Sequence, residues 1–255
     1  MPAEVKILVE GFTNANEFDE AGQEKTIPTI TLVRDDDVVM IVDPGILESQ
    51  QILIDALEKE DLTVEDVNVV FISHSHIDHY RNIGMFPNAR TLEGYGLWDK
   101  DTVEEWSEAF STNIQVLHTP GHDHTGLTLF VTTDIGVIAI CGDVFWRENY
   151  PRDPFDDTFA SNPEILKESR KVVLKMADWI IPGHGPMYKN DKDTVVVEEE
   201  INEELREKET KIVIKCKKCG NTMKQQDRCQ CRPYFCFRCC ECGLDCSTCS
   251  CSHKR

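Results

Sequence analysis

The sequence feature that most constrains the fold is HSHIDH at residues 74–79, a dense group of imidazole and carboxylate side chains. It follows an apolar run that is typical of a buried strand. The alternate residues His74 and His76 can point from the strand end to one metal ion, and the next turn can bring Asp78 and His79 to a second. Zinc binds imidazole and carboxylate groups, and a catalytic zinc site keeps one position open for water. The motif therefore predicts two metal ions at the end of a buried strand.

Further histidine and aspartate residues follow apolar runs elsewhere and lie beside glycine. Asp43 is in VDPG, Asp143 in CGD and His184 in PGHG, while HTPGH places His122 after another predicted strand. Strand ends followed by glycine turns are where a rigid scaffold presents side chains for catalysis. We therefore predict that these four residues join the HSHIDH group in one site.

The five motifs, in this order, resemble those of the metallo-β-lactamase superfamily, and the resemblance covers residues 4–190. It implies an α+β fold, the αββα sandwich, with a dinuclear metal site at one edge of the sheets. Asp143 would bridge the two ions, and Asp43 would hydrogen-bond a ligand histidine from behind. The resemblance assigns one ion to His74, His76 and His122, and the other to Asp78, His79 and His184.

CGDVFWREN and ESRKVVLKMADWIIPGHGP extend the similarity to one subgroup of the superfamily, metallo-β-lactamase domain-containing protein 1. This subgroup resembles glyoxalase II in fold and is associated with endonucleolytic cleavage of histone pre-mRNA. Only 40 residues separate Asp143 from His184, too few for the cap domain of the cleavage-factor nucleases. The segment after His184 is also too short for the helical substrate domain of typical glyoxalase II enzymes. RNA and glyoxalase II-type thioesters therefore both remain possible substrates.

The expected reaction is hydrolysis by a metal-bound hydroxide, with Asp78 and Asp143 as catalytic residues and two zinc ions. Asp78 would orient the nucleophile and pass a proton to the leaving group. The flavo-diiron relatives have glutamate where this chain has His76, so histidine favours zinc, with iron or manganese as alternatives. Three functions remain: an RNA phosphodiester endonuclease, a glyoxalase II-like thioester or small-ester hydrolase, and a non-enzymatic zinc-ribbon adaptor with a vestigial site.

Eleven of the twelve cysteines lie between Cys216 and Cys251. In an intracellular protein such a cluster indicates metal binding rather than disulfides. The spacing of two C-x2-C pairs is that of a zinc ribbon, and the module could hold one to three ions, or less readily an iron–sulfur cluster. We predict a hydrolase domain at 1–190, an acidic helical linker at 191–210 and a cysteine-rich module at 211–255. The ribbon ligands would be Cys216, Cys219, Cys236 and Cys239.

The formal net charge of −19 combines −26 for residues 1–210 with +7 for 211–255. The acidic body argues against broad nucleic-acid affinity. The basic module, with aromatic residues among its cysteines, could bind RNA or dock a protein. No signal peptide and no apolar stretch of about 20 residues is visible, which predicts a cytoplasmic protein without membrane contact.

Several residues near the motifs have more ordinary interpretations. The aromatic and charged segments 94–106 and 145–159 are expected to be connections, either a lid or simple packing. His118 and His124 flank His122 and are expected to contact backbone or line a pocket, with His124 a candidate proton donor. Cys141, inside an apolar strand, is expected in the core.

Overall fold

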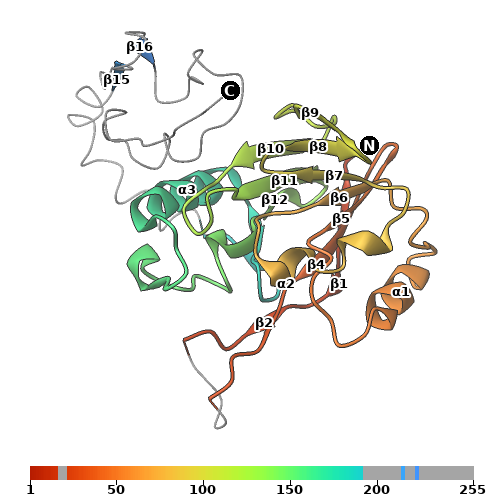
Figure 1. The fold of residues 1–255 in the computed structure, drawn as a ribbon, viewed down its shortest axis with the longest axis horizontal. Helices are drawn as coiled ribbons and strands as arrows, with labels where there is room; N and C mark the ends of the chain where they lie inside the picture. The colour runs from red at the N-terminus through yellow and green to blue at the C-terminus, as the bar shows by residue number, and fades with distance from the viewer. Residues whose placement is uncertain (17–21, 192–213, 216–221, 224–255) are drawn as a thin grey trace, which may run out of the picture. The chain divides into compact units, whose positions relative to one another are not determined.

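A computed structural model describes residues 1–16, 22–191, 214–215 and 222–223 (Figure 1). The chain divides into two compact units, Met1–Val195 and Val196–Arg255. In the described part of the second unit, β15 (Ile214–Lys215) pairs with β16 (Thr222–Met223) in antiparallel orientation. The predicted linker beyond Asp191 and the four ribbon cysteines lie outside the described residues, so these assignments stay predictions.

The first unit contains two mixed sheets and a short hairpin. In order across the first sheet, the strands are β1 (Glu4–Val9), β4 (Ile30–Asp35), β5 (Val38–Val42), β6 (Val69–Phe71), β7 (Arg90–Glu93), β8 (Gly96–Asp99) and β9 (Thr102–Glu104). The second sheet comprises β10 (Ile114–His118), β11 (Leu127–Thr133), β12 (Gly136–Ile140), β13 (Trp179–Ile181) and β14 (Tyr188–Lys189). The hairpin, which projects from the sheets in Figure 1, pairs β2 (Phe12–Thr13) with β3 (Thr26–Ile27).

The helices are short apart from the third. They are α1 (Gln51–Glu58), α2 (Ile77–Tyr80), α3 (Pro163–Met176) and the 3-10 turns Ile83–Met85, Gly142–Val144 and Pro154–Asp156. The α3 helix begins at Pro163 because the Asn162 side chain accepts a hydrogen bond from Ile165 N, and because Pro163 has no N–H that would need an acceptor.

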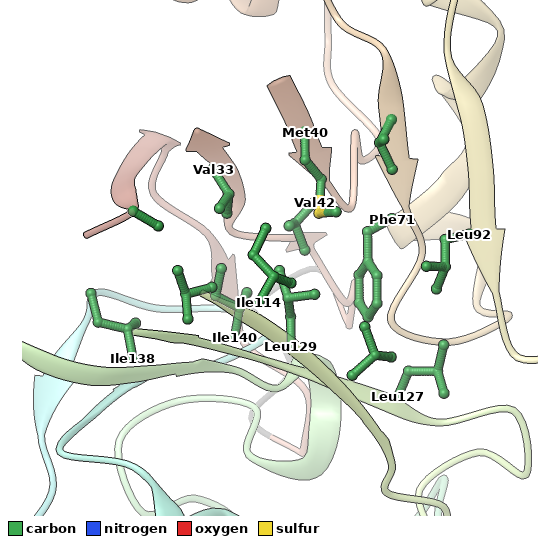
Figure 2. Close-up of a cluster of buried hydrophobic side chains, with 14 of the residues drawn as sticks. Val33, Met40, Val42, Phe71, Leu92, Ile114, Leu127, Leu129, Ile138 and Ile140 are labelled. Atoms are coloured by element: carbon green, nitrogen blue, oxygen red, sulfur yellow. The ribbon is translucent and has the colours of Figure 1, made fainter. Parts of the chain in front are cut away.

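The main core lies between the two sheets, where apolar side chains from both inner faces interdigitate (Figure 2). Alternation along each strand explains this layer, since every second side chain points to the same face. The first sheet contributes Val33, Met40, Val42, Phe71 and Leu92, and the second contributes Ile114, Leu127, Leu129, Ile138 and Ile140.

The outer face of each sheet is covered by one helix. Leu53 and Leu57 of α1 pack in a cluster with Ile41 of the first sheet. On the second sheet, Leu166 of α3 belongs to a cluster that includes Ile180. The four layers are therefore helix, sheet, sheet and helix, as the αββα prediction requires.

Strand direction brings the predicted ligands to one edge of this sandwich. The β5 and β6 strands are parallel, and so are β12 and β13. Asp43 follows the carboxyl end of β5, His74 that of β6, Asp143 that of β12 and His184 that of β13. Parallel strands end at the same edge of a sheet, so the topology gathers these side chains.

The expected connection at 94–106 was wrong, and two other sequence patterns, an apolar run over 26–33 typical of one strand and a possible helix start at Thr63, also differ from the structure. Segment 94–106 was expected to be a connection, but β8 and β9 use most of it to extend the first sheet. A single strand over 26–33 is broken at Pro28, which cannot donate to a ladder. Thr63 begins a turn closed by Asp66 rather than a helix. Among the described helices, none has the length and apolarity needed to cross a membrane.

Candidate metal centre

Two groups of potential ligand atoms lie at the carboxyl edge of the sheets, and within each group the atoms are no more than 4.8 Å apart. The first group, here called set one, is His74, His76, His122 and Asp143, and the second, set two, is Asp78, His79 and His184. These are the seven residues that the sequence analysis assigned to the two ions, and the structure brings all of them together.

Asp143 lies between the two sets. Its Oδ2 atom is 3.3 Å from Nε2 of His122 and 3.9 Å from Nε2 of His74. Its Oδ1 atom is 3.4 Å from Nε2 of His79 and 3.2 Å from Nε2 of His184. Nε2 of His184 is also 3.3 Å from Oδ2, so this ring lies near both oxygens. The one carboxylate thus lies within 3.9 Å of two imidazoles from each set, as a carboxylate that bridges two ions would.

Acidic partners fix the ring orientation of two histidines. Nδ1 of His79 is 2.8 Å from Oδ2 of Asp43, and Nδ1 of His122 is 2.7 Å from Oδ2 of Asp157. An ionised carboxylate can only accept, so each Nδ1–H donates to it. The Nε2 lone pair of each ring then faces the site, where it can bind a cation.

Neutral acceptors fix two more rings. Nδ1 of His184 donates to the carbonyl oxygen of Ile27 at 2.9 Å. The Ser73 hydroxyl donates to Oδ2 of Asp43 at 2.6 Å, which leaves its oxygen to accept from Nδ1 of His74 at 3.0 Å. Both rings thus also point an Nε2 lone pair inward.

The donor set fits divalent cations. Buried Nε2 of His74, Nε2 of His79 and Oδ1 of Asp143 have no hydrogen-bond partner among the described residues. Buried polar atoms without partners are costly, so their convergence indicates a bound group that the protein is built to hold. Nδ1 of His76 is 3.0 Å from Nε2 of His122, close enough for one ion to accept both lone pairs. Imidazole and carboxylate ligands of this kind indicate divalent metal binding.

Burial and mutual charge shift the pKa values in the site. Burial lowers the pKa of His74 well below its usual value, so this imidazole is neutral and free to ligate. For Asp143, burial raises the pKa, but His184 and His79 outweigh it and hold the pKa well below its usual value. Burial lowers the pKa of His79, but Asp143 and Asp43 raise it well above the usual value. Asp143 therefore stays ionised, and the carboxylates that hold a proton on His79 would equally stabilise a metal cation that replaces this proton.

Gly183 lets the His184 loop approach Asp143. A Cβ atom at this position would lie 1.8 Å from Oδ1 of Asp143, closer than any two non-bonded atoms can come. The loop is held in place because Gly183 N donates to Phe145 O at 2.9 Å and Thr29 N donates to Gly183 O at 2.6 Å. Only glycine therefore permits the observed distance.

Sequence reasoning missed three residues that orient the ligands. Asp157, whose side chain is fully buried, comes from the 145–159 segment, and Ser73 directly precedes the first ligand. The Thr26 hydroxyl donates to Oδ2 of Asp78 at 3.1 Å. Asp43 was predicted for this role, and its hydrogen bond to His79 has the predicted form.

The other predicted residues lie outside both ligand sets. His118 is exposed and packs on Trp106, with ring centroids 5.0 Å apart. His124 is exposed, and its Nε2 is 3.3 Å from the Tyr95 hydroxyl. Cys141 is buried in the cluster under α3, which confirms the core prediction, and burial raises its pKa to about 12.

Comparisons with known proteins find similarity to the metallo-beta-lactamase superfamily. The family model of the metallo-beta-lactamase superfamily matches residues 25–113. Metallo-beta-lactamase domain-containing protein 1 of Xenopus laevis is 29% identical over 211 residues, which cover 78% of this chain and 87% of that protein. The chain covers 65% of the mouse and rat proteins of this name and 59% of the human one.

Solved structures share the fold at low sequence identity. A candidate metallo-β-lactamase from Thermotoga maritima has a TM-score of 0.59 and 22% identity, covering 74% of this chain and 100% of that one. An N-acyl homoserine lactone hydrolase, solved with N-hexanoyl-L-homoserine bound at its catalytic metal centre, has a TM-score of 0.54 and 17% identity. The match covers 72% of this chain and 92% of the lactone hydrolase.

Proposed function

We propose that the chain is a metal-dependent hydrolase of the metallo-β-lactamase superfamily with two divalent ions, zinc in both positions. The proposal is supported by the match to the family model and by the similarity to metallo-β-lactamase domain-containing protein 1. Set one would hold one ion and set two the other. The observation that carries the proposal is the position of Asp143, whose carboxylate lies within 3.9 Å of two imidazoles from each set.

Bound together, two zinc ions would bring the pKa of a shared water molecule toward about 7 and polarise the bond under attack. The side chains supply position and proton transfer. Asp78 is the least buried of the acidic ligands, with 15% of its side chain exposed, and would orient the attacking water at the mouth. Its free oxygen would carry a proton to the leaving group.

We favour a carboxylic ester or thioester with an apolar acyl group as the substrate. Three exposed apolar side chains come from segments that carry a ligand or a group that orients one: Ile27, Ile77 and Phe159. Ile77 lies between two ligands in sequence, and the Ile27 carbonyl accepts from His184. Exposed apolar groups at a site favour an apolar ligand. The lactone hydrolase with this fold binds its hexanoyl product at the metal centre.

The charge of the 145–159 segment also supports an uncharged ester over a polyanion. It contains two arginines and four acidic residues, of which Asp157 is committed to His122. RNA phosphodiester cleavage is the second candidate, because residues 211–255 carry a net charge of +7 and could deliver a polyanion.

The deciding assay gives the zinc-loaded full-length chain p-nitrophenyl esters of increasing acyl length, an acyl thioester and a mixed single-stranded RNA pool. We expect ester or thioester turnover that rises with acyl length and leaves the RNA intact. Cleavage of RNA with no turnover of esters would reverse the order of the two candidates. A fully loaded protein that turns over none of them would refute the hydrolase and favour the adaptor.

The hydrogen bond from His122 to Asp157 gives a separate prediction about metal affinity. Asp157→Asn keeps the shape of the side chain but removes the charge that fixes the ring. We expect one of the two ions to bind about 10–100-fold more weakly, measured by competition with a chelator. Asp156→Asn, an exposed change in the same segment, is the matched control and should leave both affinities unchanged. Equal affinities in Asp157→Asn and wild type would contradict the assigned role.

A further inference from the structure

The Thr26 hydroxyl lies between two members of set two. It donates to Oδ2 of Asp78 at 3.1 Å, and its oxygen is 3.2 Å from Nδ1 of His184. Nδ1 of His184 donates to the Ile27 carbonyl, so the same N–H can be shared with the Thr26 oxygen, which has lone pairs free to accept it. One half-buried hydroxyl thus contacts a carboxylate and an imidazole of the same set.

The neighbouring residues hold the backbone that carries His184. Thr29 N donates to Gly183 O at 2.6 Å, and the Thr29 hydroxyl donates to Gly185 O at 2.8 Å. Gly185 N donates back to the Thr29 hydroxyl at 3.0 Å. Segment 26–29 therefore fixes the loop on both sides of His184 and the ring itself.

Set one is oriented by different residues. Asp157 accepts from His122, and Ser73 accepts from His74. Among the described residues, the Thr26 side chain hydrogen-bonds to Asp78 and His184, both in set two. A change at Thr26 therefore acts on one half of the centre.

We propose that Thr26 is a positioning residue that sets the affinity of Asp78, His79 and His184 for their ion and leaves the other position unaffected. This inference rests on the proposed function. The Thr26 hydroxyl donates to Oδ2 of Asp78, the oxygen that lies 3.7 Å from Nε2 of His79 and 3.6 Å from Nε2 of His184. This bond selects one rotamer of a side chain that is partly open to solvent and holds that oxygen toward the other ligands of set two. By accepting from Nδ1 of His184, the hydroxyl keeps Nε2 directed inward.

The test compares Thr26→Val, which keeps the branched shape but loses the hydroxyl, with Thr26→Ser, which keeps the hydroxyl. Cobalt(II) and zinc are titrated into the full-length chain in competition with a chelator. Because the cysteine-rich segment is the same in every variant, any ions that it binds contribute equally to each titration and do not change the difference between variants. We expect one equivalent to bind about 10–100-fold more weakly in Thr26→Val and close to wild type in Thr26→Ser.

A double variant identifies the affected position. Thr26→Val combined with Asp157→Asn should weaken two different equivalents, each by the factor seen in the single variants, because the residues serve separate sets. The inference is overturned if Thr26→Val binds like wild type, if Thr26→Ser is equally weakened, or if the double variant weakens a single equivalent further. If wild type binds no more ions than Asp143→Ala, the proposed function fails instead.

Discussion

Asp143→Ala is expected to remove both ions from the centre and to lower kcat/KM by at least about 10³-fold, or roughly 4 kcal/mol of transition-state stabilisation. The effect should be this large because the Asp143 carboxylate lies 3.2–3.9 Å from imidazoles of both sets. Loss of the carboxylate leaves each position with fewer ligands and removes the negative charge between two cations. Metal content by mass spectrometry and steady-state kinetics measure the two effects.

Asp35→Asn is the matched control, since Asp35 is also a buried carboxylate but lies near Asn113, which donates to its oxygens. This change should cost about 1–3 kcal/mol of unfolding free energy and leave metal content and kcat/KM unchanged. If Asp143→Ala retained both ions and full activity, the bridging role would be wrong and the hydrolase proposal with it.

Gly183→Ala is expected to have the second largest effect, although it adds a single methyl group. The new Cβ would lie 1.8 Å from Oδ1 of Asp143, so either the loop or the carboxylate must move. Two backbone hydrogen bonds, to Phe145 and from Thr29, resist movement of the loop. We expect a loss of about 1–3 kcal/mol of unfolding free energy and about 10²-fold in kcat/KM, because displaced ligands no longer match the ions.

Two other glycines provide a graded comparison. A Cβ at Gly185 would be 3.3 Å from Cβ of Arg147, and one at Gly84 would meet no atom within 4 Å. Thermal unfolding and kcat/KM should therefore change slightly in Gly185→Ala and not at all in Gly84→Ala. If thermal unfolding and kcat/KM were the same in all three variants, the close approach of Gly183 to Asp143 would not matter for stability or activity.

The ligands could be predicted from the sequence because each follows an apolar run and lies in a short motif. HSHIDH alone supplies four of them, and Asp143 and His184 each lie beside glycine at a strand end. The αββα layers were predictable for a related reason, since the resemblance rested on the same strand-end motifs. The local sequence pattern and the order of the motifs were sufficient to predict those ligands that lie at the ends of apolar strands.

The residues that orient the ligands could not be predicted in this way. Asp157 is 35 positions from His122, and Thr26 is 158 positions from His184. Neither belongs to a motif, and both are common surface residue types, so only the folded chain reveals their partners. The β8 and β9 strands were missed because both have exposed residues and mixed composition, which gives no apolar run for sequence analysis to detect.

The distance along the chain between Thr26 and His184 has a consequence for the order of assembly during synthesis. A ribosome completes His74, His76, His122 and Asp143 well before it reaches His184. Contacts between distant segments also form late, because closing a long loop costs chain entropy. A nascent chain could thus capture its first ion while still unfinished, and uptake of the second ion would mark the moment at which the two ends of the domain meet.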